Sequence, residues 1–127
     1  MKTATTELNE LTLRDDGILL VRSINGETHR TADAVGRMYA ELAELIDNQP
    51  CPILWDPRAI RTIRPGGWVA ITDRLERLFT ALAIVVDDQT VDLLSGYPAS
   101  WNSLLMPVRQ FEDEDEAMRW LAQFVQS

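Results

Sequence analysis

Apolar residues recur along the chain at two spacings, which predict strands near its start and helices further on. Leu11 and Leu13 alternate with polar neighbours, and the apolar run 18–21 follows the turn sequence Asp15-Asp16-Gly17. Alternation on either side of a tight turn containing glycine is typical of a β-hairpin. Residues 1–7 show no such pattern, so we expect a loose N-terminus there.

Spacings of three and four residues predict the first two helices. Thr31 is suited to cap the first, because its hydroxyl can accept a hydrogen bond from a free backbone N–H. The apolar face of this helix comprises Val35, Met38, Leu42, Leu45 and Ile46. Pro65 suits the first turn of the second helix, because that position needs no N–H donor. The expected face of the second helix comprises Val69 or Trp68, with Thr72, Leu75 and Phe79.

Two further helices follow. The third is expected to start at Asp88 or Thr90 and to break near Pro98, where the missing N–H cannot continue the helix. The last is expected to start after Asp113, because an acid there with Glu116 three residues later resembles a capping box. Its apolar face comprises Ala117, Trp120, Leu121, Phe124 and Val125.

Two short apolar runs, Ile53-Leu54-Trp55 and 81–86, predict interior strands, and a further brief strand is expected over 108–111, after Pro107. The resulting order β-β-α-β-α-β-α-β-α predicts a single α/β domain over residues 1–127, with helices packed on a sheet. The side chains that we expect to be most deeply buried are Leu42, Ile53, Leu54, Val85, Trp120 and Phe124.

Three short motifs stand in an order that is similar to a known family. A strand ends in aspartate at Ile53-Leu54-Trp55-Asp56, a proline precedes the short strand 108–111, and an acidic helix start leads to Ala117-Met118-Arg119-Trp120-Leu121. Over residues 11–125 the chain resembles the STAS-like domains, the SpoIIAA-like fold of bacterial anti-sigma-factor antagonists. Within them it is similar to small stand-alone STAS/CRAL-TRIO-like proteins, mostly without assigned function. The resemblance implies an α/β sandwich with a mixed sheet and about four helices, mainly on one face.

The regulatory motif of that family is altered here. In anti-sigma-factor antagonists the second helix opens with a serine that a partner kinase phosphorylates, within a D-S-S-G stretch. When Asp56 is placed on the first aspartate of the motif, Arg64-Pro65-Gly66-Gly67 occupies the D-S-S-G position. Because Gly66 has no hydroxyl to receive a phosphate, the regulatory activity does not carry over with the fold.

The chain is acidic, with a formal net charge of −8. This charge disfavours nucleic acid and anionic membranes as partners, because both attract basic surfaces. Cys51 is the only cysteine, so we expect no internal disulfide and no cysteine-rich zinc site. We find no apolar leader and no apolar run of about 18 residues. We therefore expect a cytoplasmic protein that has no metal or cofactor.

One stretch inverts this acidic balance. Residues 58–77 contain two acids, Asp73 and Glu76, and five arginines: Arg58, Arg61, Arg64, Arg74 and Arg77. Part of the stretch lies between a predicted central strand and a helix start, where open α/β sheets commonly bind ligands. Helix-start N–H groups and planar guanidinium groups both suit an anion or an acidic partner. The residues in that position are Arg58, Arg61, Arg64, Gly66 and Gly67. The alternative is that these arginines pair with the surplus of surface acids.

Trp68, Tyr97 and Trp101 lie outside the clearly apolar helix faces. A shared patch of these aromatics would mark a dimer interface or a small-ligand site. Packing in the core is the alternative, as we expect for Trp55 and Trp120. Exposed aromatics and the small size of the chain lead us to expect a homodimer.

No group of residues forms a recognisable catalytic motif. His29 is the only histidine, no G-x-S-x-G sequence accompanies it, and we expect it on the surface. Cys51 lies between two prolines without a second cysteine, and we expect a packing residue. The acids of 112–116 are accounted for by the dipole of the helix that they begin.

The sequence therefore predicts a non-enzymatic regulatory or protein-interaction domain that binds a protein partner or a second copy of itself. The alternative is a carrier or sensor of a small apolar or anionic ligand, which the CRAL-TRIO-like resemblance allows. An apolar cavity between the sheet and the helices would favour the carrier. A flat aromatic patch on the surface would favour the interaction domain.

Overall fold

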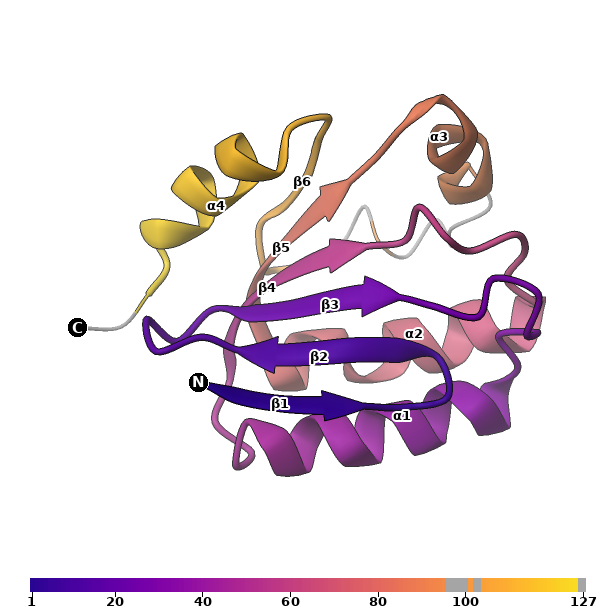
Figure 1. Ribbon diagram of the computed structural model, residues 1–127, viewed down its shortest axis with the longest axis horizontal. Helices are drawn as coiled ribbons and strands as arrows, with labels where there is room; N and C mark the ends of the chain where they lie inside the picture. Colours follow the sequence, from indigo (N-terminus) through magenta and orange to yellow (C-terminus); the bar gives the residue numbers. More distant parts are fainter. Residues whose placement is uncertain (96–100, 102–103, 126–127) are drawn as a thin grey trace.

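The computed structural model describes residues 1–95, 101 and 104–125. Its strands form one six-stranded mixed sheet in which neighbours in space are also neighbours in sequence (Figure 1). In order across the sheet they are β1 (Lys2–Thr5), β2 (Asn9–Leu13), β3 (Leu19–Ser23), β4 (Cys51–Asp56), β5 (Phe79–Val85) and β6 (Val108–Phe111). The pairs β1–β2 and β2–β3 are antiparallel, whereas β3–β4, β4–β5 and β5–β6 are parallel.

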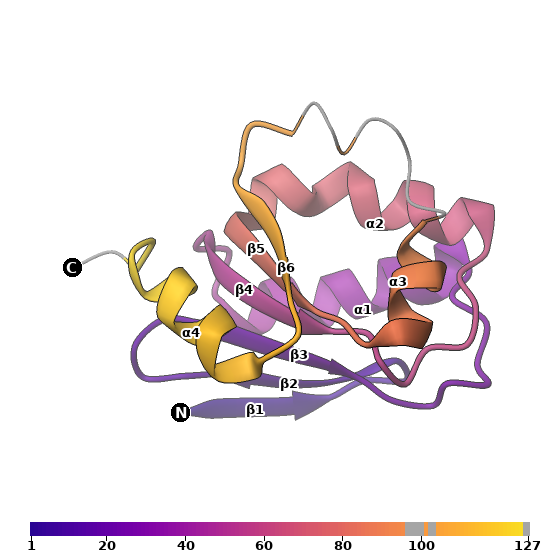
Figure 2. The same ribbon diagram turned by 90° about the horizontal axis from the view of Figure 1, so that it is seen from above.

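Each parallel pair is joined by a helix that crosses over the sheet, because parallel neighbours cannot be joined by a tight turn. These helices are α1 (Ala32–Leu45), α2 (Pro65–Leu78) and α3 (Asp88–Leu94), and α4 (Glu114–Ala122) follows the last strand. Helices α1 and α2 lie together on one face of the sheet, and α4 covers the other face (Figure 2). The prediction of a mixed sheet with helices mainly on one face is confirmed.

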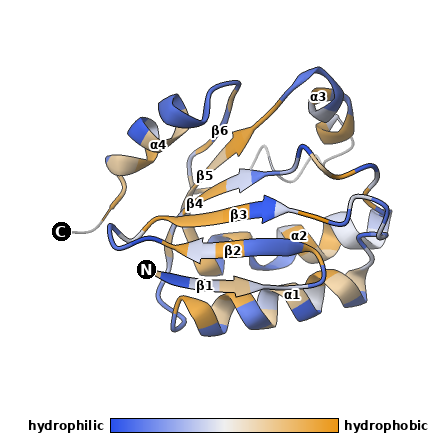
Figure 3. Ribbon diagram, in the orientation of Figure 1, coloured by the Kyte–Doolittle hydropathy of each residue, from blue (hydrophilic) through white to orange (hydrophobic). Residues whose placement is uncertain are grey.

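The two faces of the sheet give two hydrophobic clusters. Successive residues of a strand point to opposite faces, so Ile53 joins the larger cluster under α1 and α2, while Leu54 joins the smaller one under α4. The strand β5 contributes to both clusters and is hydrophobic along most of its length (Figure 3). The carboxyl ends of β3, β4 and β5 meet at one edge of the sheet.

The prediction of a loose N-terminus over residues 1–7 is wrong. Residues 2–5 form β1, which pairs antiparallel with β2 from Lys2 opposite Leu13 to Thr5 opposite Glu10. This strand has no apolar alternation because it lies at the edge of the sheet and its side chains are mostly exposed. Backbone hydrogen bonds to β2 hold it there, and side-chain pattern gives no sign of them.

The predicted helix boundaries follow local chemistry closely. The Thr31 hydroxyl accepts from the Ala34 N–H at the start of α1, and Pro65 is the first residue of α2. The open choice on α2 is resolved in favour of Trp68, because Val69 points to solvent with 65% of its surface exposed. Phe79 belongs to β5 and not to the helix.

The predicted core is confirmed in four of its six positions. Leu42, Ile53, Leu54 and Val85 are buried, but Trp120 and Phe124 are only half-buried. Their rings meet edge-to-face with centroids 5.0 Å apart and pack against the edge of the smaller hydrophobic cluster. Helix α4 is the only described helix on its face of the sheet, so no second helix among the described residues covers that edge.

Candidate functional site

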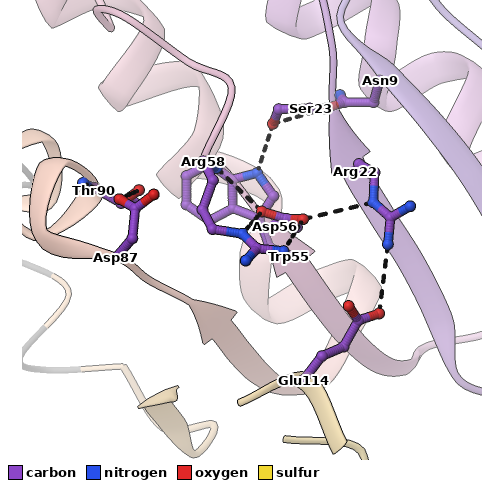
Figure 4. Close-up of polar contacts among 9 residues, drawn as sticks. All are labelled: Asn9, Arg22, Ser23, Trp55, Asp56, Arg58, Asp87, Thr90 and Glu114. Atoms are coloured by element: carbon purple, nitrogen blue, oxygen red, sulfur yellow. Dashed lines mark hydrogen bonds and ion pairs between the residues drawn. The ribbon is translucent and has the colours of Figure 1, made fainter. Parts of the chain in front are cut away.

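Ionic side chains gather where β3 and β4 end (Figure 4). Asp56, the last residue of β4, is buried, and its carboxylate accepts from Arg58 Nε at 2.9 Å and from Arg58 Nη2 at 3.0 Å. Arg22 of β3 lies 3.5 Å from the same carboxylate and 3.5 Å from Glu114 at the start of α4. This network joins β3 and β4 to α4, the helix that lies on the face of the sheet opposite α1 and α2.

The Asp56 carboxyl is held in its charged form. Burial raises its pKa, but the hydrogen bonds from Arg58 and the charges of Arg58 and Arg22 outweigh burial and leave the pKa below its ordinary value. The Arg58 guanidinium is therefore already paired with the buried Asp56 carboxylate. For this residue the structure matches the alternative interpretation, in which the arginines pair with acids.

The other two arginines of the predicted cluster lie apart from Arg58. Arg61 is exposed and lies 3.4 Å from Glu27, a second pairing with an acid. The exposed Arg64 guanidinium lies 3.4 Å from Nε2 of His29. Among the described residues no carboxylate lies within ion-pair distance of Arg64. Of the three, Arg64 is the one whose charge is available to a partner.

The two glycines of the predicted site have different roles. A side chain on Gly67 would place its Cβ only 1.9 Å from the Arg30 carbonyl oxygen, so only glycine allows α2 to start this close to the segment before α1. Gly66 faces outward, and its nearest neighbour would be the Ala32 Cβ at 3.7 Å, an ordinary contact. Gly67 is thus required by packing.

Further along α2 lie two more arginines, together with the exposed acids Asp73 and Glu76. Arg74 and Arg77 are exposed, and neither has a carboxylate within ion-pair distance among the described residues. Arg74 lies over the Tyr39 ring, 5.8 Å from its centroid. Val69 lies between these charges along the helix. We call Arg61, Arg64, Val69, Arg74 and Arg77 the α2 surface.

The predicted exposure of the aromatics is wrong for two of the three residues. Trp68 and Trp101 are each 6% exposed, and their rings meet edge-to-face with centroids 5.6 Å apart. The Trp101 indole N–H donates to the Thr72 hydroxyl, which itself donates to the Trp68 carbonyl. Trp101 reaches α2 from a distant part of the chain, a contact that no helical period encodes. Tyr97 lies outside the described residues.

A cavity of about 50 Å³ lies between the sheet and the helices α1 and α2. Most of its lining is apolar, with Val21 and Ile53 from the sheet and Val35, Leu42 and Ile71 from the helices. Asn9, Ser23, Arg30 and Trp55 add polar groups to this lining. The Ser23 hydroxyl donates to Asn9 Oδ1 at 3.2 Å and accepts from the Trp55 indole N–H at 3.3 Å (Figure 4).

Arg30 is the least expected member of this lining, because its side chain is charged and the residue is only 2% exposed. Its terminal nitrogens donate to the carbonyl oxygens of Asn25, Thr28, Leu8 and Ile24. Burial lowers the pKa of the guanidinium, which still keeps its proton because an arginine starts from so high a value. A positive charge is thus buried beside an apolar cavity.

The remaining candidates for chemistry lie apart from one another. His29 is exposed, and Cys51 is buried at the start of β4, where burial raises the pKa of the thiol to about 11. Within the described part of the chain, no three His, Cys, Asp or Glu side chains are arranged to hold a metal ion. No helix in that part is both long and apolar enough to cross a membrane.

The fold places the chain among the proteins with a SpoIIAA-like fold. A similar solved structure is an uncharacterized DUF3478 family protein with a SpoIIAA-like fold from Shewanella loihica PV-4, with a TM-score of 0.65 over 95% of this chain and 98% of that chain. The two sequences are 15% identical, so the likeness shows the fold alone. The model of the Domain of unknown function DUF7793 matches residues 11–125, and the chain belongs to that family. No curated protein matches the chain.

The sequence did not single out Arg30, Asn9 or Ser23. Arg30 stands in a polar stretch beside His29, and Asn9 and Ser23 are ordinary polar residues at the ends of short strands. Ser23 lies opposite Asn9 in the antiparallel pairing of β2 with β3. Correct alignment of that hairpin would have paired the two residues, but nothing in the sequence shows that Arg30 turns inward.

Proposed function

We propose that this protein is a cytoplasmic, non-enzymatic interaction domain whose α2 surface binds an acidic protein partner. The observation that carries the proposal is the set of exposed arginines on α2, of which Arg64, Arg74 and Arg77 have no acidic partner among the described residues. Elsewhere the chain is strongly acidic, with a net charge of −8. Such a local inversion attracts an acidic surface and disfavours a basic one.

The composition of the α2 surface also suits a protein contact. Arginine is enriched in protein interfaces, because its stem packs against apolar groups while its planar head forms directed hydrogen bonds. Val69 supplies an exposed apolar side chain among these arginines.

The α2 surface lacks the serine that is phosphorylated in anti-sigma-factor antagonists, because Gly66 has no hydroxyl. We propose that this surface acts through binding alone and not through a covalent phosphate.

Charge reversal on this surface tests the proposal. The variant Arg64→Glu/Arg77→Glu changes two exposed side chains of the α2 surface, and the control Arg109→Glu/Arg119→Glu makes the same change on β6 and α4. Tagged wild type and both variants are used for affinity capture from the native cell, with quantitative mass spectrometry. We expect proteins that the wild type and the control capture and that the α2 variant loses.

Two outcomes of that experiment decide against the proposal. Capture of the same proteins by all three forms, or loss in the control as well, would show that the α2 surface is not the binding site.

Light scattering at micromolar concentration tests whether the partner is a second copy of the chain, as the predicted homodimer requires. A mass above 14.4 kDa that the α2 variant reduces would identify the acidic surface of this chain itself as the partner.

A second candidate function is a carrier or sensor of a small ligand, and the cavity between the sheet and α1 and α2 favours it. Its size limits the ligand. A water-sized group needs about 10–15 Å³ of such space, so the cavity of about 50 Å³ has room for about three to five non-hydrogen atoms. A lipid-sized ligand therefore does not fit this arrangement of α1 and α2, and the second candidate concerns small molecules only.

A further inference from the structure

The buried guanidinium of Arg30 lacks a close counter-charge; burial lowers its pKa, and the charge of Glu7 raises it only from beyond ion-pair distance. Its hydrogen-bond partners are four backbone carbonyl oxygens, which are neutral. Among the described residues no carboxylate lies within ion-pair distance of it. A buried charge is normally paired, because removal from water costs several kcal/mol that neutral dipoles recover only in part. The charge therefore favours a negative group in the space beside it.

Asn9 supplies an unused donor at the same cavity. The residue is 4% exposed, and its Oδ1 accepts from the Ser23 hydroxyl. Its Nδ2 has no hydrogen-bond partner among the described residues, yet the atom is not completely enclosed by protein. An accessible amide N–H group without a protein acceptor is available to a ligand or to water.

The Arg30 guanidinium is bonded to the backbone next to Asn9 and Ser23, and both Arg30 and Asn9 line the cavity. Arg30 donates to the carbonyls of Leu8 and Ile24, which directly precede Asn9 and follow Ser23 in the chain. The Ile24 N–H also donates to the Leu8 carbonyl at 2.8 Å, which fixes these segments side by side. The rest of the lining, from Val21 and Ile53 to Leu42, is apolar.

We propose that this cavity binds a short-chain carboxylate, with its carboxylate group beside Asn9 and Arg30 and its alkyl group between the sheet and α1. This assignment rests on the second candidate function and names its ligand class. The volume selects acids of about four or five non-hydrogen atoms, such as acetate and propionate. An amine is repelled by the guanidinium, and a neutral amide of the same shape gains the hydrogen bond without the charge interaction.

Titration of the wild-type protein with matched ligands tests the assignment. The Trp55 indole N–H is the reporter, because it donates to the Ser23 hydroxyl that orients Asn9. We would follow its ¹⁵N–¹H cross-peak while adding sodium propionate, propionamide or, at matched ionic strength, sodium chloride. The expected result is saturable binding of propionate, at least about tenfold weaker binding of propionamide, and no saturable response to chloride.

Asn9→Leu removes the amide donor at nearly constant size, and Arg119→Ala is the control because Arg119 is exposed on α4 and does not line the cavity. We expect propionate to bind at least about tenfold more weakly to the Asn9 variant and unchanged to the control. Equal binding of propionate and propionamide to the wild type would overturn the carboxylate assignment and leave the second candidate function in place. If no small molecule shifts the Trp55 signal, both are wrong.

Discussion

Arg58 binds both carboxylate oxygens of Asp56, two residues before it in the chain, with hydrogen bonds of 2.9 and 3.0 Å. This contact ties the first arginine of the basic stretch to the end of the central strand β4. It also divides the stretch into an internal part, which is paired within the chain, and the exposed α2 surface, which we propose binds a partner.

The first prediction concerns the Asp56 carboxylate and pH. Burial raises its pKa, but the hydrogen bonds from Arg58 and the charges of Arg58 and Arg22 together outweigh burial, so the pKa in the folded protein lies below its ordinary value. Its stabilisation is then complete above the unfolded pKa and is lost as pH falls through the lower folded pKa. Asp56→Asn should lower the free energy of unfolding by about 1–3 kcal/mol at neutral pH.

Urea unfolding at neutral pH and near pH 3 measures this effect, and the deficit of Asp56→Asn should shrink at the lower pH. Asp16→Asn is a matched control, because Arg14 and Asp16 form a similar pair two residues apart that is 41% exposed on both sides. An exposed pair is worth about 0–1 kcal/mol. Equal deficits of the two variants would show that the Asp56 network does not stabilise the fold.

The second prediction separates the adjacent glycines. Gly67→Ala would force a Cβ to 1.9 Å from the Arg30 carbonyl oxygen, and backbone atoms must move to relieve it. We expect thermal unfolding to show a loss of at least about 2 kcal/mol. Gly66→Ala has room and removes backbone freedom from the unfolded chain, so stability should be unchanged or rise by up to about 1 kcal/mol. Similar losses at both positions would contradict the packing role of Gly67.

The third prediction compares a fully buried side chain beneath α4, Leu54, with a half-buried one just after this helix, Phe124. Leu54 is fully buried beneath the helix, and Leu54→Ala should cost about 2–5 kcal/mol through lost burial and the cavity left behind. Phe124 is half-buried and packs against Trp120, so Phe124→Ala should cost less than about 2 kcal/mol. Denaturant unfolding of both variants gives the comparison. A larger loss at Phe124 would mean that the C-terminal side of α4 is covered in solution.

The fourth prediction concerns phosphorylation of α2. The Thr72 hydroxyl donates to the Trp68 carbonyl and accepts from Trp101, so a kinase cannot reach it without opening that contact. Thr62 is exposed, but it lies in the loop before the helix and not at the position of the family serine. We expect phosphopeptide mapping of protein from its native cell to find no substantial phosphate at either threonine. Substantial phosphate on either would restore a covalent switch to this surface.

The fifth prediction concerns the Cys51 thiol. Burial raises its pKa to about 11, so almost none of it is thiolate at neutral pH. Iodoacetamide should modify the native protein slowly and the urea-unfolded protein rapidly, as followed by intact mass. Rapid modification of the native protein would show that the start of β4 opens readily.

The confirmed parts of the prediction are those that depend on residues close together in the chain. The hydroxyl of Thr31, the ring of Pro65 and the turn before β3 each act within a few residues, so composition and spacing locate them. The order of strands and helices from β2 onward follows for the same reason. That order, together with the strand ending at Asp56, is enough to predict the SpoIIAA-like fold.

Tertiary structure decided everything that depends on distant residues. Trp101 buries its ring against Trp68, β1 joins the sheet through backbone hydrogen bonds, and Asp56 takes Arg58 out of the basic surface. Arg30 turns inward because carbonyls of two separate segments converge on it. Local spacing shows which side chains could share a face, but burial and ion pairing are set by what the fold brings opposite them. The sequence therefore determined the architecture, and the fold alone determined which charges remain free to bind.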